Sequence, residues 1–253
     1  MLSKQYLVEV SLDRDKVPSF DEYPFCLDAV KNLTTLRLHP AVTYLIGENG
    51  SGKSTLLEGI ATAWGFNPEG GSRNFNFASY ASHSELYRKL RLSRGVKKAR
   101  DGFFLRAESF YNVASEIERL DQGGGGRRII DSYGGASLHG QSHGESFLAL
   151  MMKRFGGNGL YILDEPEAAL SPTRQMALIA RMHDLVRQES QFIIATHSPV
   201  VMAYPDAQIY HLDSAGIEPI GYEETEHFQV TRQFLNNPQE MLKFILEGED
   251  NSE

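Results

Sequence analysis

A glycine-rich segment in the first quarter of the chain carries the strongest chemical signal. Residues 47–55 read Gly-Glu-Asn-Gly-Ser-Gly-Lys-Ser-Thr and follow Val42–Ile46, an apolar run typical of a buried strand. This is the G-x-x-x-x-G-K-[ST] pattern in its required place, after a strand and at the start of a helix. Glycines let the backbone turn its N–H groups toward phosphate oxygens, and the helix N-terminus adds positive potential. The segment predicts a site for a purine nucleoside triphosphate.

Each residue of this loop is a candidate ligand of the nucleotide. The set is Gly47, Glu48, Asn49, Gly50, Ser51, Gly52, Lys53, Ser54 and Thr55. We expect Lys53 to reach the β- and γ-phosphates and the Ser54 hydroxyl to bind Mg²⁺. Thr55 should lie near the α-phosphate.

A pair of carboxylates follows a second apolar run. Leu160–Leu163 ends in Asp164 and Glu165. A buried strand delivers its last residues to the carboxyl edge of the sheet, where ligands of such folds bind. Asp164 is therefore expected to hold Mg²⁺, directly or through water, and Glu165 to polarise the attacking water as general base. A surface Asp-Glu pair without function is the alternative.

Three further motifs are needed, because phosphate loops with a strand-end acid occur in kinases, GTPases, AAA+ motors and ABC ATPases alike. Gln141–Ser146 precedes Phe147–Phe155, which has helical character. Glu167–Pro172 follows the acid pair almost directly. Thr196–Pro199, with His197 in it, follows the apolar run Phe192–Ala195. A lone Thr-His pair is weak evidence, but its place in this order strengthens it.

In this order the motifs resemble those of an ABC-type ATPase domain, a class of P-loop NTPase. Ser142–Ser146 is similar to a divergent LSGGQ signature, with matches at Ser142 and Gly144 and with Glu145 in place of glutamine. The resemblance implies that Ser142, Gly144 and Glu145 contact the γ-phosphate of ATP held by another protomer. A serine hydroxyl and backbone amides at a helix N-terminus suit that task.

The same resemblance gives roles to the other motifs. Ala168–Ser171 matches the D-loop, which crosses the dimer interface, and His197 matches the switch histidine, which contacts the γ-phosphate and helps orient the water. The resemblance spans about Tyr6 to Asp213 and is closer to soluble SMC/RecF-like heads than to transporter subunits. It is closer still to small stand-alone bacterial AAA family ATPases, on the runs Gly70–Phe75 and Phe104–Phe110.

Two departures from the family pattern limit what the resemblance implies. The Q-loop glutamine, expected after the candidate strand Gly102–Ala107, is replaced by Glu108, which we take as the substitute metal ligand. The interval from Glu108 to Gln141 is too short for the long coiled coil of SMC proteins. Tyr23 and Phe25 are the candidates for stacking on the adenine.

The elements that position these motifs alternate between strands and helices. The predicted strands are Tyr6–Val10, Val42–Ile46, Leu160–Leu163, Phe192–Ala195 and Ile209–Leu212, and the predicted helices are Lys53–Trp64 and Thr173–Gln188. The pattern predicts an α/β fold with a largely parallel sheet. We expect a single ABC-type domain over residues 1–253, with its core at about 1–78 and 145–222. The polar segment 79–144 is expected to form an inserted, mainly helical lobe, with Gly123–Gly126 as a linker.

The C-terminal segment, about residues 228–247, is expected to be helical. Pro238 interrupts Phe228–Leu246, so two short helices are favoured over one. Its apolar side chains could pack onto the core, or they could form a partner or dimer surface.

Composition excludes some classes of protein. The chain has 25 basic and 33 acidic residues, net −8, so a globally basic nucleic-acid binder is disfavoured. A local basic stretch could contact nucleic acid or could be a solvated helix face: Arg88, Lys89, Arg91, Arg94, Lys97, Lys98 and Arg100. The single cysteine, Cys26, excludes an intramolecular disulfide. No long apolar run and no signal-like start is present, so we expect a cytoplasmic protein without direct membrane insertion.

The predicted function is ATP hydrolysis used as a conformational switch. The resemblance implies a homodimer that encloses two ATP molecules with Mg²⁺ and acts on nucleic acid or an unidentified protein partner. An ATPase subunit that energises a separate membrane transporter, and a slow nucleotide-gated scaffold, are the alternatives.

Overall fold

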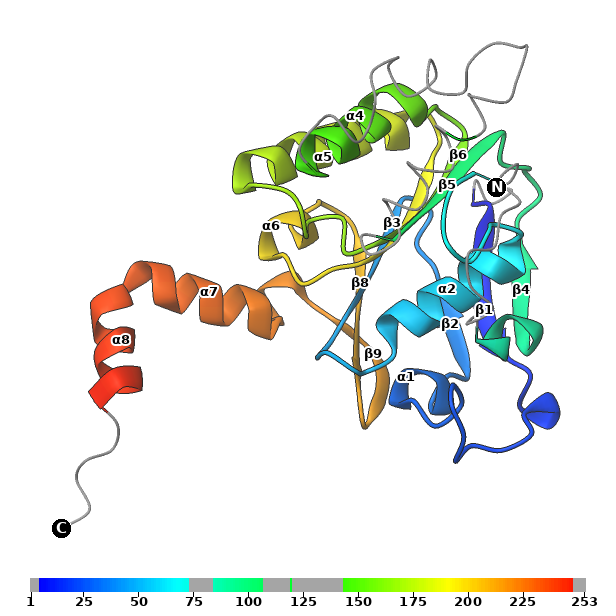
Figure 1. Cartoon of the computed structure of the whole chain (residues 1–253), viewed down its shortest axis with the longest axis horizontal. Coiled ribbons are helices and arrows are strands. Elements are labelled where there is room, and N and C mark those ends of the chain that lie inside the picture. Colours follow the sequence, from blue (N-terminus) through cyan, green and yellow to red (C-terminus); the bar gives the residue numbers. More distant parts are fainter. Residues whose placement is uncertain (1–4, 73–83, 107–118, 120–142, 248–253) are drawn as a thin grey trace.

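A computed structural model describes residues 5–72, 84–106, 119 and 143–247 (Figure 1). Its strands are β1 (Leu7–Leu12), β2 (Thr35–Arg37), β3 (Val42–Ile46), β4 (Leu90–Arg94), β5 (Asp101–Arg106), β6 (Gly159–Asp164), β7 (Gln191–Ala195), β8 (Gln208–Asp213) and β9 (Gly216–Ile220). Its α-helices are α1 (Asp28–Lys31), α2 (Lys53–Trp64), α4 (His143–Arg154), α5 (Pro172–Arg187), α6 (Pro199–Met202), α7 (Glu226–Asn236) and α8 (Pro238–Glu247). Short 3₁₀ helices are η1 (Arg14–Lys16), η2 (Glu85–Arg88) and η5 (Tyr222–Glu224).

The larger sheet has six strands in the order β5-β6-β7-β3-β8-β9. All neighbouring pairs are parallel except β8 and β9, which form an antiparallel hairpin. The predicted α/β class with a largely parallel sheet is therefore confirmed. Each predicted strand is present, with bounds shifted by at most a few residues.

Both faces of this sheet are covered, which explains why its strands are apolar without alternation. Strand β6 shows the arrangement most clearly. Tyr161 and Leu163 point into a core shared with α4 and α5. Leu160 and Ile162 point to the opposite face, into a core shared with α2. Period-two alternation is thus present, but both sets of side chains are buried.

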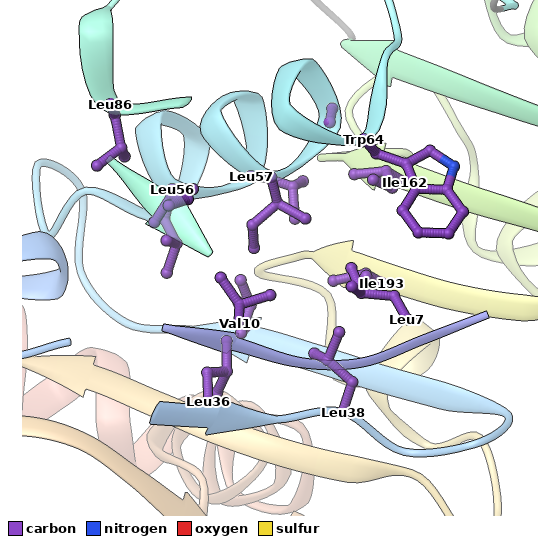
Figure 2. Close-up of a cluster of buried hydrophobic side chains, with 14 of the residues drawn as sticks. Leu7, Val10, Leu36, Leu38, Leu56, Leu57, Trp64, Leu86, Ile162 and Ile193 are labelled. Carbon is purple, nitrogen blue, oxygen red and sulfur yellow. The ribbon is translucent and has the colours of Figure 1, made fainter. Parts of the chain in front are cut away.

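The second core lies between the two sheets, and α2 runs through it (Figure 2). A smaller antiparallel sheet, β2-β1-β4, contributes Val10 and Leu36, while the larger sheet contributes Ile162 and Ile193. Leu57 of α2 lies between these layers and is fully buried. Helix α2 is therefore held on both sides, and its N-terminus carries the phosphate loop.

Replacement of Leu57 by alanine is expected to lower the free energy of unfolding by about 2–5 kcal/mol, because it leaves a cavity between the two sheets. Urea denaturation of both proteins measures this difference. Leu235→Ala is the matched control, since Leu235 is 70% exposed on α7, and its effect should stay within about 0.5 kcal/mol. Equal losses in the two variants would contradict this account of the core.

The predicted helical lobe is wrong for the part of it that the structure describes. Within residues 84–106, β4 belongs to the smaller sheet and β5 to the larger one. Strand β5 confirms the candidate strand Gly102–Ala107, with its bounds shifted by one residue. In β4, Leu90 and Leu92 alternate with charged or polar residues, which is the period-two pattern of an edge strand. The density of arginine and lysine obscured this pattern in the sequence. The rest of the predicted lobe, including Gly123–Gly126, lies outside the described residues apart from residue 119 and the start of α4.

The C-terminal segment forms two helices, α7 and α8, as predicted from Pro238. Pro238 is the first residue of α8, where its missing N–H costs no helical hydrogen bond. Both helices extend away from the sheets (Figure 1). Of the two alternatives for their apolar side chains, packing onto the core is wrong for the exposed ones: Val230, Phe234, Leu235, Leu242, Phe244, Ile245 and Leu246. In the described part of the chain, no helix has both the length and the apolar character that a membrane span requires.

Candidate nucleotide site

The phosphate loop connects the last residue of β3 to the first residue of α2. All three of its glycines have positive φ angles, which side chains oppose: 146° at Gly47, 86° at Gly50 and 95° at Gly52. A Cβ at Gly47 would overlap the carbonyl oxygen of Leu212. The loop therefore needs glycine at these positions in order to form a backbone cradle open to a ligand.

Lys53 is buried at the N-terminus of α2. Its Nζ donates hydrogen bonds to the carbonyl oxygens of Gly47 and Glu48, both at 2.7 Å. Burial lowers the pKa of the Lys53 ammonium, while the charges of Glu165 and Asp164 oppose that change. The loop thus holds the cation at the position where phosphate oxygens would approach.

Ser54 joins the phosphate loop to the end of β6. Its hydroxyl donates a hydrogen bond to Oδ1 of Asp164 at 3.1 Å, although the two residues are far apart in the sequence. Asp164 is 6% exposed. A hydroxyl oxygen beside a carboxylate is the kind of hard oxygen pair that Mg²⁺ prefers. The two residues therefore fit the metal that the sequence predicts.

Glu165 has an unusual backbone for a residue with a side chain. Its φ is 49°, in the left-handed region, and its N–H donates to the carbonyl oxygen of Ala195 at 2.9 Å. Such strain is found most often where function requires a particular side-chain direction. The carboxylate is 42% exposed, and its Oε1 lies 3.7 Å from Nε2 of His197. A water molecule can therefore reach this carboxylate.

His197 lies just after β7 and is held by two contacts. Its backbone N–H donates to Oε1 of Glu167 at 2.6 Å. Its ring Nδ1 lies 3.1 Å from Nε2 of His227, in the first turn of α7. Burial raises the pKa of the Glu167 carboxyl, while the hydrogen bond from the His197 N–H opposes that change and stabilises the charged form.

Comparison with known proteins finds two matching family models and solved structures of the same fold. Residues 24–134 match a family model described as an AAA domain, and residues 81–203 match one described as an AAA domain, putative AbiEii toxin, Type IV TA system. A solved ATP-binding cassette of an ABC transporter superposes with a TM-score of 0.50 at 17% identity, covering 93% of this chain and 97% of that one. The chain has the fold of an ATP-binding cassette.

Two further proteins are similar to this chain. The SMC head domain from Thermotoga maritima superposes with a TM-score of 0.44 at 16% identity, covering 86% of this chain and 100% of that one. A curated protein, ABC transporter G family member STR2 of Medicago truncatula, is 27% identical over 187 residues. That match takes in 68% of this chain but only 26% of the relative's length.

The structure distinguishes between the two candidates for stacking on the adenine. Tyr23 is 64% exposed and lines a cavity of about 170 Å³ with Lys53, Thr55 and Glu165. Phe25 is 4% exposed and packs in the core between the sheets. Phe25 is therefore wrong as a stacking candidate, because its ring is used for packing.

The remaining predicted contacts are only partly within the described residues. Gly144 and Glu145 lie in the first turn of α4. Ser142 and Glu108 lie outside the described residues. The sequence alone assigns no role to Glu167 or His227. Glu167 could have been found, because it lies in the motif Glu167–Pro172. His227 could not, because only the tertiary structure brings it next to His197.

The basic stretch does not form one helix face. It begins at Arg88, the last residue of η2, continues along the edge strand β4, and ends in the connection between β4 and β5. Several of its cations are engaged within the protein. Arg88 pairs with Glu85, Arg91 with Asp13 and Lys97 with Glu189, and the Arg94 guanidinium lies 4.5 Å from the Trp64 ring. This engagement reduces the charge available to a nucleic acid.

The histidine pair makes the stability of the cassette depend on pH. Burial lowers the pKa of both His197 and His227, and the Lys53 charge adds to this, while Glu165 and Glu226 oppose it. The unfolded chain therefore takes up protons first as the pH falls through 6.5, the ordinary histidine value. The stabilisation is present above that pH and is lost below it.

Urea denaturation at about pH 7.5 and about pH 5.5 tests this dependence. The wild type is expected to lose more free energy of unfolding between the two pH values than the double variant His197→Gln, His227→Gln. The double variant corrects for every other titrating group, including His39. Equal losses in the two proteins would contradict the prediction.

Proposed function

We propose that this chain binds ATP with Mg²⁺, hydrolyses the γ-phosphate, and uses the cycle as a switch between an open and a closed dimer. The observation that carries the proposal is the hydrogen bond between Ser54 and Asp164. It joins the phosphate loop to the acid pair, and it brings Lys53, Glu165 and His197 to the same edge of the sheet. Ligands of open α/β sheets bind at such an edge.

The binding role falls to the loop and the start of α2. Backbone N–H groups of the glycine-rich loop and the Lys53 ammonium would contact the phosphates. Ser54 and Asp164 would hold Mg²⁺, which when bound neutralises charge on the phosphate oxygens. Tyr23 would stack on the adenine, since its ring is exposed at the same cavity.

The hydrolytic role falls to Glu165 and His197. The Glu165 carboxylate accepts a proton from water as the water oxygen attacks the γ-phosphorus, and the bond to the β-phosphate oxygen breaks. His197 lies 3.7 Å from that carboxylate and would orient the water and donate to a γ-phosphate oxygen. Its lowered pKa keeps the ring neutral near pH 7.

The dimer follows from the signature motif of the family that the chain resembles. By that resemblance, Ser142, Gly144 and Glu145 of one copy would contact the nucleotide held by the phosphate loop of another copy. Each nucleotide site would then be formed by two copies of the chain. The arrangement is isologous, with two-fold symmetry and two ATP molecules between the copies. Binding of both nucleotides favours closure, and hydrolysis reopens the dimer.

The partner of the switch is a separate part of the proposal. Nucleic acid at the basic stretch is one candidate, although its several ion pairs count against it. Coupling to a membrane subunit is a second candidate, because two similar proteins are an ATP-binding cassette of an ABC transporter and an ABC transporter. We favour a protein partner for two reasons. Helices α7 and α8 expose apolar side chains that a protein could cover. The basic stretch, in contrast, already uses several of its cations in ion pairs.

Phosphate release by the purified protein tests this proposal. The assay is run with and without single-stranded DNA, double-stranded DNA and RNA, with Glu165→Gln as the blank. We expect ATP turnover that needs Mg²⁺ and changes little with nucleic acid. Stimulation that falls with added salt would instead favour nucleic acid as the partner. No turnover above the blank would overturn the hydrolytic role.

A further inference from the structure

Two imidazole rings from distant parts of the chain meet beside the phosphate loop. His197 follows β7, and His227 lies in the first turn of α7. Nδ1 of His197 is 3.1 Å from Nε2 of His227, and the ring centroids are 5.3 Å apart at an interplanar angle of 53°. Both rings line a cavity of about 690 Å³ that also includes Gly47, Glu48 and Asn49. The pair therefore lies next to the proposed γ-phosphate position.

A contact between two ring nitrogens allows only one proton between them. Both rings are neutral near pH 7, because burial lowers the pKa of each. Either His227 donates to His197, or the reverse. The other nitrogen of His197, Nε2, faces Oε1 of Glu165 at 3.7 Å, and a carboxylate can only accept. That distance is beyond hydrogen-bond reach, but a proton on Nε2 of His197 is attracted by the carboxylate, whereas a lone pair there is repelled. The favoured arrangement therefore has a proton on Nε2 of His197 and a second proton on Nε2 of His227, donated to His197 Nδ1.

The backbone around His227 is fixed to the loop that carries His197. Thr225, fully buried, caps α7 by accepting a hydrogen bond from the Phe228 N–H at 3.3 Å. The Tyr222 ring lies 4.7 Å from the Phe228 ring, and the Tyr222 hydroxyl donates to the Pro199 carbonyl oxygen at 2.9 Å. Pro199 lies two residues after His197. The start of α7 is thus attached to the segment that carries His197, so the relative position of the two histidines is fixed.

We propose that His227 is a positioning residue that holds His197 in the Nε2–H tautomer and directs that N–H toward Glu165 and the phosphate edge. The proposal rests on the proposed function for its kinetic consequence. The tautomer itself depends only on the contact between the two rings. In a histidine, the hydrogen bond made by one ring nitrogen sets whether the other ring nitrogen carries the proton.

Two substitutions of His227 separate the hydrogen bond from packing. His227→Phe keeps a ring of similar size and removes the donor. His227→Gln keeps an amide N–H that can reach His197 Nδ1. We expect kcat to fall between about tenfold and a hundredfold in His227→Phe, because the acting N–H is no longer fixed. The ATP affinity should change little, and His227→Gln should recover most of kcat.

The ring ¹⁵N spectrum of His197 in the nucleotide-free protein provides a readout that does not need catalysis. We expect the Nε2–H tautomer in the wild type and in His227→Gln, and a mixture of tautomers in His227→Phe. His183→Phe is the matched control. It removes the polar contact of another histidine, whose Nδ1 lies 3.3 Å from the Tyr204 hydroxyl oxygen. Both kcat and the His197 spectrum should stay unchanged.

The outcomes distinguish this proposal from the proposed function. If the wild type does not hydrolyse ATP, the proposed function fails, and the spectrum alone decides the role of His227. An identical His197 spectrum in the wild type and His227→Phe overturns the positioning role, as does an unchanged kcat in an active protein. If His227→Phe does not fold, His227→Ala, which adds no volume, replaces it in both measurements.

Discussion

The Glu165→Gln protein is expected to bind ATP as the wild type does and to lose at least about 10²-fold in kcat. Glutamine keeps the size of the side chain but cannot accept the proton of the attacking water. The carboxylate is 42% exposed, so water can reach it, and its Oε1 lies 3.7 Å from Nε2 of His197. Phosphate release at saturating ATP measures the loss.

The same substitution should trap the closed dimer. With ATP and Mg²⁺ bound and hydrolysis blocked, the step that reopens the dimer is removed. Light scattering after size exclusion should therefore report twice the monomer mass for Glu165→Gln with ATP, and the monomer mass without it. Glu218→Gln, on the exposed strand β9, is the matched control and should behave as the wild type does. A monomeric Glu165→Gln protein at saturating ATP and Mg²⁺ would refute the dimer.

Replacement of Lys53 by alanine has the second largest expected effect. Loss of a charge-assisted contact to phosphate is worth about 1.5–3 kcal/mol, so the dissociation constant for ATP should rise between about tenfold and a hundredfold. The lysine already lies in the loop, with Nζ held by the carbonyl oxygens of Gly47 and Glu48. It therefore reaches the phosphates with little reorganisation. Calorimetric titration with ATP measures the change.

A control is needed because Lys53 also stabilises the loop. Lys31→Ala removes an exposed lysine at the end of α1 and should leave the ATP affinity unchanged. The melting temperature of Lys53→Ala shows whether the loop still folds. An ATP affinity equal to the wild type in a folded Lys53→Ala protein would show that the phosphate loop is assigned wrongly.

Local patterns in the sequence were sufficient for the central sheet and the phosphate loop. Val42–Ile46 and Lys53–Trp64 were predicted with the bounds that β3 and α2 have. Their signals are local: an apolar run for a strand covered on both faces, glycines where the backbone has to turn, and helical spacing after Lys53. Pro238 likewise marked the boundary between α7 and α8, since proline has no N–H for a helix interior.

Where the signal was not local, sequence reasoning failed. Strand β4 was taken for part of a helical lobe, because its pairing partner, β1, lies far away in the chain and its charged residues hid the alternation. Tyr23 and Phe25 were equal candidates for stacking on the adenine, and only tertiary packing decides that the Phe25 ring is buried and the Tyr23 ring is exposed. Packing onto the core was one of two alternatives for the C-terminal apolar residues, yet α7 has no buried residue and extends away from the sheets.

The residue pattern alone was enough to place a phosphate loop, an acid pair and a histidine, each at the end of its own strand. Which of these side chains meet could be read only from the folded chain. Parallel pairing of β3, β6 and β7 brings Ser54 to Asp164 and His197 to Glu165. The contact between His197 and His227 depends on where α7 begins relative to β7. Such contacts arise from the packing of distant segments, and no local pattern of residue types encodes them.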